Sequence, residues 1–454
     1  MTDDTSFFGK RVCLLGLGVS NLALLDFLAA RGARLSVREC RAPDTLPLSV
    51  AELCGRGVRL ICGEGYLDNI DEDILFRSPG MRPDLPPLAA AVAKGAVLYD
   101  EIQLFCARSP ATLLGVTGSD GKTTTTALAA HLLRHARRDR DIRVALGGNI
   151  GTPLIGELPH LRSGDLAVAE LSSFQLMTQT KPPARAVITN ITENHLNWHR
   201  GMAEYIEAKK RILGEATHAI LNAENDITAM VARERANLTL FSSRRTRGEL
   251  VANFGACHTV TRERGMLCYD GKELFPAHVI PLPGIHNLEN VMAAVGLVFP
   301  YVDANLLREA VASFLGVSHR LQLIATVDGV RYFDSSIDST PTRTAAALAA
   351  LDTSPILLCG GRGKGLSFSP LARAVRGRVR VLLLFGEARE EIGQAMCEAD
   401  VPYLSFPTMG EAVLAAKAMA REGDVVLLSP ACTSFDEFRN FEDRGDTFRR
   451  LVLE

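Results

Sequence analysis

The segment at residues 115–123 reads Gly-Val-Thr-Gly-Ser-Asp-Gly-Lys-Thr, and it constrains the fold more than any other part of the chain. It has the spacing Gly-x-x-x-x-Gly-Lys-Thr, with an apolar, strand-like run at 111–116 before it and a helical pattern from 123 to about 135 after it. Glycines in this position let backbone N–H groups wrap a phosphate, and the start of the following helix adds positive potential. The sequence therefore predicts a phosphate-binding loop, and a ligand-free glycine-rich turn is the weaker alternative.

Each residue type in this loop has a distinct role in holding a nucleoside triphosphate. Lys122 is expected to bridge the β- and γ-phosphates, and the Thr123 hydroxyl is expected to bind Mg²⁺. The predicted ATP contacts of the loop are Gly118, Gly121, Lys122, Thr123 and Thr124. By itself the loop indicates ATP or GTP without choosing the reaction.

Composition excludes several other classes of protein. The net charge of −2 leaves no basic field for generic nucleic-acid binding. Ten cysteines without a Cys-x-x-Cys pair do not support a zinc site or a redox motif. No apolar run approaches the roughly 18 residues of a membrane span, and the acidic start is unlike a signal peptide. We expect a cytoplasmic protein that binds neither nucleic acid nor membrane.

Short apolar runs alternate with amphipathic stretches and glycine-rich turns along the whole chain, which predicts an α/β fold with largely parallel sheets. The length of 454 residues suggests about three domains. We expect a Rossmann-like N-terminal domain at 1–100, a central P-loop ATPase domain at 101–316 and a Rossmann-like C-terminal domain at 317–454. The polar, arginine-rich stretch at 242–247 is interpreted as a surface insertion.

A second glycine-rich turn, Gly16-Leu-Gly18, follows the first predicted strand. It lacks the third glycine of Gly-x-Gly-x-x-Gly, so NAD binding is disfavoured, whereas another nucleotide diphosphate remains plausible at this helix start. Glu39 and Arg41 follow the second strand, where a ribose- or base-facing residue would lie, but spacing alone equally allows ordinary surface charges.

Candidate metal ligands follow two central strands. Glu170 ends the apolar run 166–170, and His195 follows the next strand, so both are expected at the carboxyl edge of the sheet, where ligands bind. Position alone leaves His195 more often structural than a ligand. Lys209 and Lys210 read as solvated charges on a helix. Asn287 could cap a helix or contact a nucleotide, and the sequence leaves both readings open.

Taken together, these motifs resemble the Mur ligase family of peptidoglycan synthesis over nearly the whole chain, and most closely its D-glutamate-adding branch. Further motifs in the family's order carry the resemblance: Gly148-Asn149-Ile-Gly151, Glu170-Leu-Ser-Ser-Phe-Gln-Leu, Asn190-Ile-Thr-Glu-Asn-His195, Pro283-Gly-Ile-His-Asn287-x-x-Asn290, His319-Arg320, Gly360-Gly-Arg-Gly-Lys364, and the block from Leu428 to Gly445 that contains Ser434-Phe435 and Phe441. The last block is the most specific.

The resemblance implies an ATP-dependent amide ligase. It would activate the carboxylate of UDP-N-acetylmuramoyl-L-alanine as an acyl phosphate and join it to D-glutamate, releasing ADP and phosphate. Rival readings are a folylpolyglutamate-synthase-like ligase, a regulatory protein that kept the loop but lost synthesis, and a P-loop kinase. A monomer is expected, with closure of the third domain over the other two.

The resemblance also implies roles for single residues. Lys122, His195 and Lys209 would be catalytic, and Asn287, Asn290 and Arg320 would join the loop in contacting ATP. Two Mg²⁺ ions are expected, one held by Thr123 and Glu170, the other by Glu170, His195 and Lys209. Lys209 aligns with a lysine that family members carry as a carbamate, which turns a cation into a carboxylate-like ligand. The implied UDP-sugar contacts are Gly18, Glu39, Arg41, Ser78, Gly80 and Asn149. The implied D-glutamate contacts are Ser339, Lys364, Ser434, Phe435 and Phe441.

Two runs depart from the family's pattern. Asn194-His195-Leu-Asn197 stands where the family often has Asp-His-x-Asp, which keeps the histidine but reduces the local charge. Ile337 stands where many homologues have the lysine of Asp-Ser-Lys-Ala-Thr, which puts the contact to the side-chain carboxylate of D-glutamate in doubt. Arg343 could supply the missing charge. No general base for the incoming amine is identified.

Overall fold

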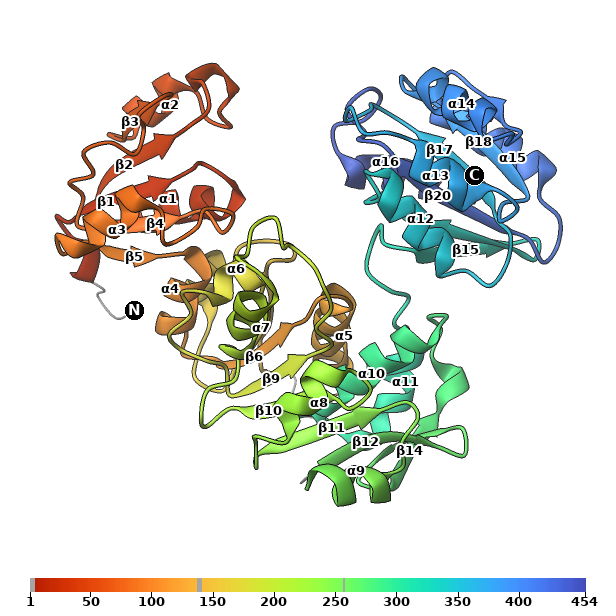
Figure 1. Ribbon diagram of the computed structural model, residues 1–454, viewed down its shortest axis with the longest axis horizontal. Helices are drawn as coiled ribbons and strands as arrows, with labels where there is room; N and C mark the ends of the chain where they lie inside the picture. Colours follow the sequence, from red (N-terminus) through yellow and green to blue (C-terminus); the bar gives the residue numbers. More distant parts are fainter. Residues whose placement is uncertain (1–4, 137–140, 256–257) are drawn as a thin grey trace. The chain divides into compact units, whose positions relative to one another are not determined.

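The computed structural model describes residues 5–136, 141–255 and 258–454, and it divides into two compact units. The first unit comprises Met1–Val279 with Glu289–Val311, and the second comprises Ile280–Leu288 with Ala312–Glu454. Three sheets, parallel over most of their strands, confirm the predicted α/β class (Figure 1). The predicted domain boundaries near 100 and 316 stay predictions. Within the described ranges, every helix is too short or too polar to cross a membrane.

The N-terminal sheet of the first unit has the strand order β3-β2-β1-β4-β5, and all of its strand pairs are parallel. Its strands are β1 (Arg11–Leu15), β2 (Arg34–Glu39), β3 (Arg59–Cys62), β4 (Ile74–Arg77) and β5 (Val97–Tyr99). The connecting helices are α1 (Val19–Ala29), α2 (Val50–Gly55) and α3 (Pro86–Ala93). The order reverses between β1 and β4, so the loops that follow these two strands flank a crevice of the kind in which such sheets bind ligands.

The central sheet has the order β14-β13-β12-β11-β10-β9-β6-β8-β7. Its strands are β6 (Thr112–Thr117), β7 (Val144–Gly148), β8 (Leu166–Glu170), β9 (Arg185–Ile188), β10 (His218–Asn222), β11 (Leu238–Ser242), β12 (His258–Glu263), β13 (Met266–Tyr269) and β14 (Lys272–Pro276). Its helices are α4 (Glu101–Arg108), α5 (Lys122–His135), α6 (Ser173–Leu176), α7 (Met202–Lys210), α8 (Asp226–Ala232), α9 (Arg247–Phe254), α10 (Ile285–Val298) and α11 (Leu307–Ala312). Strand β6 carries the phosphate loop and lies between β8 and β9, so the ends of all three strands meet at one edge.

The sheet of the second unit has the order β15-β16-β20-β17-β18-β19. Its strands are β15 (Gln322–Val327), β16 (Val330–Asp334), β17 (Ile356–Gly360), β18 (Val381–Phe385), β19 (Leu404–Ser405) and β20 (Val425–Ala431). Its helices are α12 (Pro341–Ala349), α13 (Ser369–Val375), α14 (Arg389–Glu398), α15 (Met409–Met419) and α16 (Phe441–Leu453). A hydrophobic core lies on each face of this sheet, because strands such as β17 are buried on both sides.

Short 3-10 helices complete the described chain: η1 (Thr5–Phe7), η2 (Pro43–Thr45), η3 (Leu154–His160), η4 (Ala277–Val279), η5 (Phe299–Tyr301) and η6 (Ala304–Leu306).

Three antiparallel hairpins at sheet edges were not predicted from the strand pattern. Each joins its strands through two residues that end in glycine: Arg264-Gly265, Asp270-Gly271 and Asp328-Gly329. In all six residues φ lies between 48° and 80°, the conformation in which a two-residue turn follows the twist of its strands. The two Asp-Gly pairs were therefore a readable signal.

The strands predicted at 111–116 and 166–170 and the helix predicted from 123 to about 135 are present as β6, β8 and α5, with ends shifted by at most one residue. The stretch 242–247 forms the short connection from β11 to α9, and Arg244, Thr246 and Arg247 in it are exposed, as a surface segment requires; its interpretation as an insertion stays a prediction. Ser242 is buried, and Thr246 caps α9 through a reciprocal hydrogen-bond pair with Glu249. Local capping chemistry, rather than hydropathy, determines this turn.

Candidate functional site

The phosphate loop leaves β6 at Thr117 and enters α5 at Lys122. Gly121 precedes the helix with φ of 77°, and Gly118 has φ of 151°, so both occupy conformations that favour glycine. A Cβ at Gly118 would collide with the Thr189 hydroxyl, and one at Gly121 would collide with the side-chain oxygen of Asn290. The structure thus places Asn290, a predicted ATP contact, directly against the loop.

Residues at the end of β9 hold this loop in place. The Ser119 N–H donates to the carbonyl of Asn190 at 2.9 Å, and the Asp120 N–H donates to the Asn190 side chain at 2.9 Å. Lys122 Nζ donates to the carbonyl of Ser119 at 2.7 Å, which keeps the ammonium beside the loop. Thr123 and Thr124 are half-buried in the first turn of α5. The loop is therefore shaped before any phosphate arrives.

Glu170 ends β8 beside the phosphate loop, since it pairs with Val116 of β6. Its side chain is buried, and Oε1 accepts a hydrogen bond of 2.7 Å from Asn149 Nδ2. Its other oxygen, Oε2, is buried without a hydrogen-bond partner among the described residues. Burying a carboxylate oxygen unpaired is costly, so a cation beside Oε2 would satisfy the site. Asn149, a predicted UDP-sugar contact, thus lies next to a predicted metal ligand.

Lys209 lies on α7 with its side chain turned into the protein rather than into solvent. It is 1% exposed, and Nζ donates to the carbonyl of Gly118 at 2.5 Å. Burial and the charge of Lys122 lower the pKa of Lys209 to about 6, so its amine is largely neutral at neutral pH. The interpretation of Lys209 as a solvated charge is wrong, because α7 packs this face against the loop. Lys210 is more exposed and pairs with Glu207 at 3.2 Å.

His195 lies in the segment between β9 and α7, with a left-handed φ of 55°. Its ring meets the ring of Phe174 edge-on at a centroid distance of 5.0 Å. Loss of hydration, followed by the charge of Lys122, lowers the pKa of His195. The neutral imidazole that results is the form that binds metals. The structure therefore brings together the three residues that were predicted to be catalytic.

The described residues contain no group of three His, Cys, Asp or Glu side chains that could hold a metal ion. A neutral lysine amine adds little to Glu170 and His195, and an ammonium would repel a cation. A carbamate on Lys209 or the oxygens of a bound phosphate would add the oxygen ligands that Mg²⁺ prefers.

Apart from Asn149, which lies beside Glu170 at the central sheet, the predicted sugar-nucleotide residues lie at the carboxyl edge of the N-terminal sheet. Gly18 is the N-cap of α1, and Glu39 Oε2 accepts hydrogen bonds from the Leu17 N–H at 2.9 Å and from Arg41 at 2.7 Å. Burial alone would raise the pKa of Glu39, but these hydrogen bonds lower it to about 2. Glu39 and Arg41 therefore form a fixed pair at the glycine turn rather than independent surface charges.

Ser78 follows the neighbouring strand β4, and its hydroxyl donates to the carbonyl of Leu15 at the end of β1 at 2.9 Å. A Cβ at Gly16 would lie 2.6 Å from that hydroxyl. Gly80 follows in the same turn, and its carbonyl accepts a hydrogen bond of 2.7 Å from the indole of Trp198.

In the second unit, the structure brings Lys364 and Ser339 together, with Nζ donating to the hydroxyl at 3.0 Å. Arg343 Nη1 donates to the carbonyl of Ile337 at 3.3 Å, so this guanidinium lies at the run where the lysine is missing. Ser434 is buried, whereas the Phe435 side chain is 59% exposed. These residues surround the carboxyl ends of β16, β17 and β20.

The remaining predicted contacts of the second unit have other neighbours. Phe441 packs edge-on against His319 at a centroid distance of 6.0 Å, so its ring has a structural partner. Burial raises the pKa of Asp338, and the charge of nearby Arg320 offsets part of this rise. Asn287 is the third residue of α10, and its amide donates to the carbonyl of Pro283 at 2.6 Å. The capping alternative for Asn287 is therefore wrong, because it lies inside the first turn.

Comparison with known proteins identifies the family. A model described as the Mur ligase middle domain matches residues 116–298, and one described as the Mur ligase, glutamate ligase domain matches residues 319–432. A UDP-N-acetylmuramoylalanine--D-glutamate ligase of Symbiobacterium thermophilum is 40% identical, over 98% of this chain and 98% of that protein. The enzyme of the same name from Ruminiclostridium cellulolyticum is 39% identical, over 98% and 96%.

The chain belongs to the Mur ligase family.

Solved structures agree on the fold of this Mur ligase. The UDP-N-acetylmuramate-alanine ligase of Thermotoga maritima superposes with a TM-score of 0.57 at 19% identity, over 98% of this chain and 99% of that one. A UDP-N-acetylmuramoylalanyl-D-glutamyl-2,6-diaminopimelate--D-alanyl-D-alanyl ligase of Acinetobacter baumannii gives 0.53 at 17% identity, over 99% and 92%. At such identities the likeness concerns the fold alone.

Several buried charged residues of this Mur ligase were given no role from the sequence. Arg444 is fully buried on α16, where it donates to the Ser336 hydroxyl and to three backbone carbonyls, those of Ser336, Cys432 and Thr433. It thereby ties together the strand ends that carry Ser339 and Ser434. Arg77 and Arg82 act similarly around the Ser78–Gly80 turn. Each of these arginines lies near glycines or serines in the sequence, which is a weak indication of a structural role. Hydropathy alone does not distinguish a buried arginine from one on the surface.

Proposed function

We propose that this Mur ligase joins D-glutamate to UDP-N-acetylmuramoyl-L-alanine, at the expense of ATP, in peptidoglycan synthesis. The observation that carries the proposal is a phosphate loop whose Gly118 and Lys122 lie against a buried lysine, Lys209. The names of the full-length relatives supply the substrates. Both substrates and ATP are soluble cytoplasmic compounds, so we place the reaction in the cytoplasm, and we retain the monomer as a prediction.

Amide formation requires activation, because a carboxylate is a poor electrophile. In the proposed sequence the L-alanyl carboxylate attacks the γ-phosphorus of ATP, ADP leaves, and an acyl phosphate forms. The amine of D-glutamate then attacks the acyl carbon, and inorganic phosphate leaves. Lys122 and the backbone N–H groups of the loop would stabilise the charge on the transferred phosphoryl oxygens.

Glu170, His195, Thr123 and a carbamate on Lys209 are the residues that would hold the two Mg²⁺ ions expected from the family. Bound Mg²⁺ supplies Lewis-acid polarisation of phosphoryl oxygens. Two observations support this assignment: Oε2 of Glu170 has no hydrogen-bond partner within the described part of the chain, and the amine of Lys209 is largely neutral, the form that reacts with carbon dioxide.

The remaining predicted contacts divide between the substrates. We assign Asn287, Asn290 and Arg320 to ATP, and the Ser78–Gly80 turn, Gly18, Glu39, Arg41 and Asn149 to the UDP-sugar. We assign Ser339, Lys364, Ser434, Phe435 and Phe441 to D-glutamate. The Lys364–Ser339 contact supports a site for an anionic amino acid, although Phe435 and Phe441 rest on the family resemblance alone.

One assay tests the proposed function. The protein is incubated with Mg²⁺, ATP, UDP-N-acetylmuramoyl-L-alanine and D-glutamate, and phosphate release is followed together with formation of the amide. Phosphate release that depends on D-glutamate and fails with L-glutamate supports the proposal. Release without any need for D-glutamate, a phosphorylated product, or turnover with a folate substrate instead would each contradict it.

We expect Arg343→Ala to raise the KM for D-glutamate by about tenfold while leaving the KM for ATP unchanged, because a charge-assisted hydrogen bond to the side-chain carboxylate is lost. The position of Arg343 beside Ile337 motivates this expectation. Steady-state kinetics with each substrate varied in turn measures it. Arg373→Ala, an exposed arginine on α13, is the matched control. An unchanged KM for D-glutamate would remove Arg343 from the site.

A further inference from the structure

Two arginines, Arg77 and Arg82, flank the Ser78–Gly80 turn. Arg77 contacts helix α6, and Arg82 contacts α7 and the loop before it. Arg77 is fully buried, and its Nη1 donates to the carbonyls of Pro79 at 3.0 Å and Met81 at 2.9 Å. Its Nη2 donates to the carbonyl of Phe174 on α6 at 2.7 Å and pairs with Asp100 at 3.1 Å. One guanidinium thus fixes both the turn and the start of α6.

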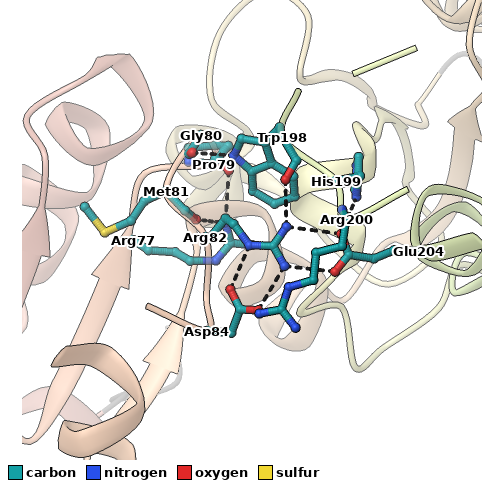
Figure 2. Close-up of polar contacts among 10 residues, drawn as sticks. All are labelled: Arg77, Pro79, Gly80, Met81, Arg82, Asp84, Trp198, His199, Arg200 and Glu204. Atoms are coloured by element: carbon teal, nitrogen blue, oxygen red, sulfur yellow. Dashed lines mark hydrogen bonds and ion pairs between the residues drawn. The ribbon is translucent and has the colours of Figure 1, made fainter. Parts of the chain in front are cut away.

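Arg82 makes the second connection, to the segment that follows His195 (Figure 2). Its guanidinium donates to the carbonyl of Trp198 at 2.7 Å and grips both carboxylate oxygens of Glu204, at 2.8 and 3.1 Å. It also lies over the indole ring, 4.9 Å from the centroid. The indole N–H returns a hydrogen bond of 2.7 Å to the carbonyl of Gly80. The turn and the segment are therefore joined twice, once by a hydrogen bond from Arg82 to the segment and once by a hydrogen bond from Trp198 to the turn.

These contacts hold the backbone of the segment that contains His195. The N–H groups of Trp198 and His199 both donate to the carbonyl of His195 at 3.0 Å. The ring of Phe174 packs against Trp198 at 4.3 Å and against His195 at 5.0 Å between centroids. Because His195 has a left-handed φ, its backbone is strained and needs such external support.

Glu204 extends the same network to Lys209. It lies in the first turn of α7 and accepts hydrogen bonds from the Arg200 N–H at 2.8 Å and from Arg82. Its Oε2 lies 3.2 Å from His199 Nδ1, and His199 Nε2 is 2.9 Å from the Ser173 hydroxyl. Lys209 stands at the other end of this helix, so a shift at Glu204 would move the buried amine as well.

We propose that Arg82 and Trp198 are positioning residues, which couple the Ser78–Gly80 turn to the placement of His195 and Lys209. A sugar nucleotide seated against the turn would thereby order the phosphoryl-transfer side of the site. The expected effect on the reaction rate rests on the proposed function. The contacts between the turn and the His195 segment do not depend on it. The planar fork of Arg82 contacts Glu204 and the Trp198 carbonyl together, whereas a lysine ammonium could make only part of this set of contacts.

Trp198 is the single tryptophan of the chain, so its fluorescence reports on this segment alone. In Arg82→Gln we expect emission of the free protein at longer wavelength and stronger quenching by acrylamide, because the indole loses the guanidinium that covers its ring. We expect kcat to fall about 10- to 100-fold, as displacement of a reacting group by an ångström can cost, with the KM for D-glutamate unchanged. Arg82→Lys should keep part of the wild-type emission and part of the wild-type kcat.

Arg143→Gln is the matched control, since it breaks an Arg–Glu contact of 2.8 Å, to Glu157, elsewhere in the same unit. Thermal unfolding of both variants separates lost stability from lost positioning. Wild-type emission in Arg82→Gln, or shifted emission with wild-type kcat, would overturn the proposal, as would equal kinetic losses in Arg143→Gln. Absence of ligase activity in the wild-type protein would instead refute the proposed function. The fluorescence comparison would still test whether Arg82 covers the indole of Trp198. If Arg82→Gln does not fold, Glu204→Gln carries the same measurements.

Discussion

Lys122→Met is expected to lower the rate of ATP-dependent amide formation by about a thousandfold or more, the scale of loss when one preorganised charge leaves a phosphoryl-transfer site. Lys122 Nζ lies at the carbonyl of Ser119, at the start of α5, where it can reach the phosphates. Methionine keeps the length of the side chain but removes the charge. Phosphate release and amide formation, measured with all three substrates, report the change.

The fold should survive this substitution, because Lys122 is half-buried and the loop is held by Asn190. Circular dichroism and thermal unfolding check that. Lys181→Met, at an exposed position of the same domain, is the matched control and should keep wild-type turnover. Turnover of Lys122→Met within about tenfold of wild type would contradict the role given to the loop.

Lys209→Met is expected to lower the rate of ligation by about a hundredfold to a thousandfold, because the side chain could no longer carry a carbamate toward the metal site. Carbon-13 NMR after equilibration with labelled bicarbonate should show a carbamate signal in the wild type and none in the variant. Lys210→Met is the matched control: its side chain is paired with Glu207 near the surface, and it should retain activity. A fully active Lys209→Met would refute the carbamate.

The same substitution is expected to stabilise the folded protein. With a folded-state pKa of about 6, Lys209 is neutral in the fold while the unfolded chain, with a pKa of about 10.4, still binds a proton. Between these values the unfolded state binds more protons, so the contribution of Lys209 to the free energy of unfolding rises with pH. In buffer depleted of carbon dioxide, Lys209→Met should exceed the wild type in stability most near pH 6, and the difference should shrink toward pH 10. Denaturant unfolding at several pH values measures it, and a gap that is independent of pH would contradict the buried, neutral amine.

Much of the fold follows from local patterns that the sequence displays openly. The run at 166–170 is apolar up to a terminal glutamate, and it forms β8 with Glu170 at its end. The phosphate loop needs two glycines in special conformations, and the chain supplies them at 118 and 121. Edge hairpins were overlooked because their strands are short and mixed in polarity, although Asp270-Gly271 and Asp328-Gly329 mark them.

The candidate site is less accessible from the sequence, because burial depends on which helix face packs inward. Lys209 and Lys210 are adjacent and chemically identical, yet one is sealed against Gly118 and the other pairs with Glu207. Only the family resemblance, and not the pattern of charges, distinguished them in advance. The contacts that join Arg82 to Trp198 and Trp198 to Gly80 gave no signal in the sequence, since each joins residues more than 100 positions apart in the chain.

The sequence by itself determined the α/β class, the phosphate loop and, through its ordered motifs, the Mur ligase family. The class and the loop depend on residues that are neighbours along the chain or recur at helix and strand spacing, so local conformational preferences suffice for them, whereas the family was given by the resemblance of the motifs to known Mur ligases. The tertiary structure alone decided that Lys209 is buried and neutral, that one oxygen of Glu170 lacks a partner among the described residues, and that Arg82 joins the Gly80 turn to the His195 segment. Each depends on the packing of distant elements, which sets local dielectric and geometry and therefore the chemistry that a side chain can perform.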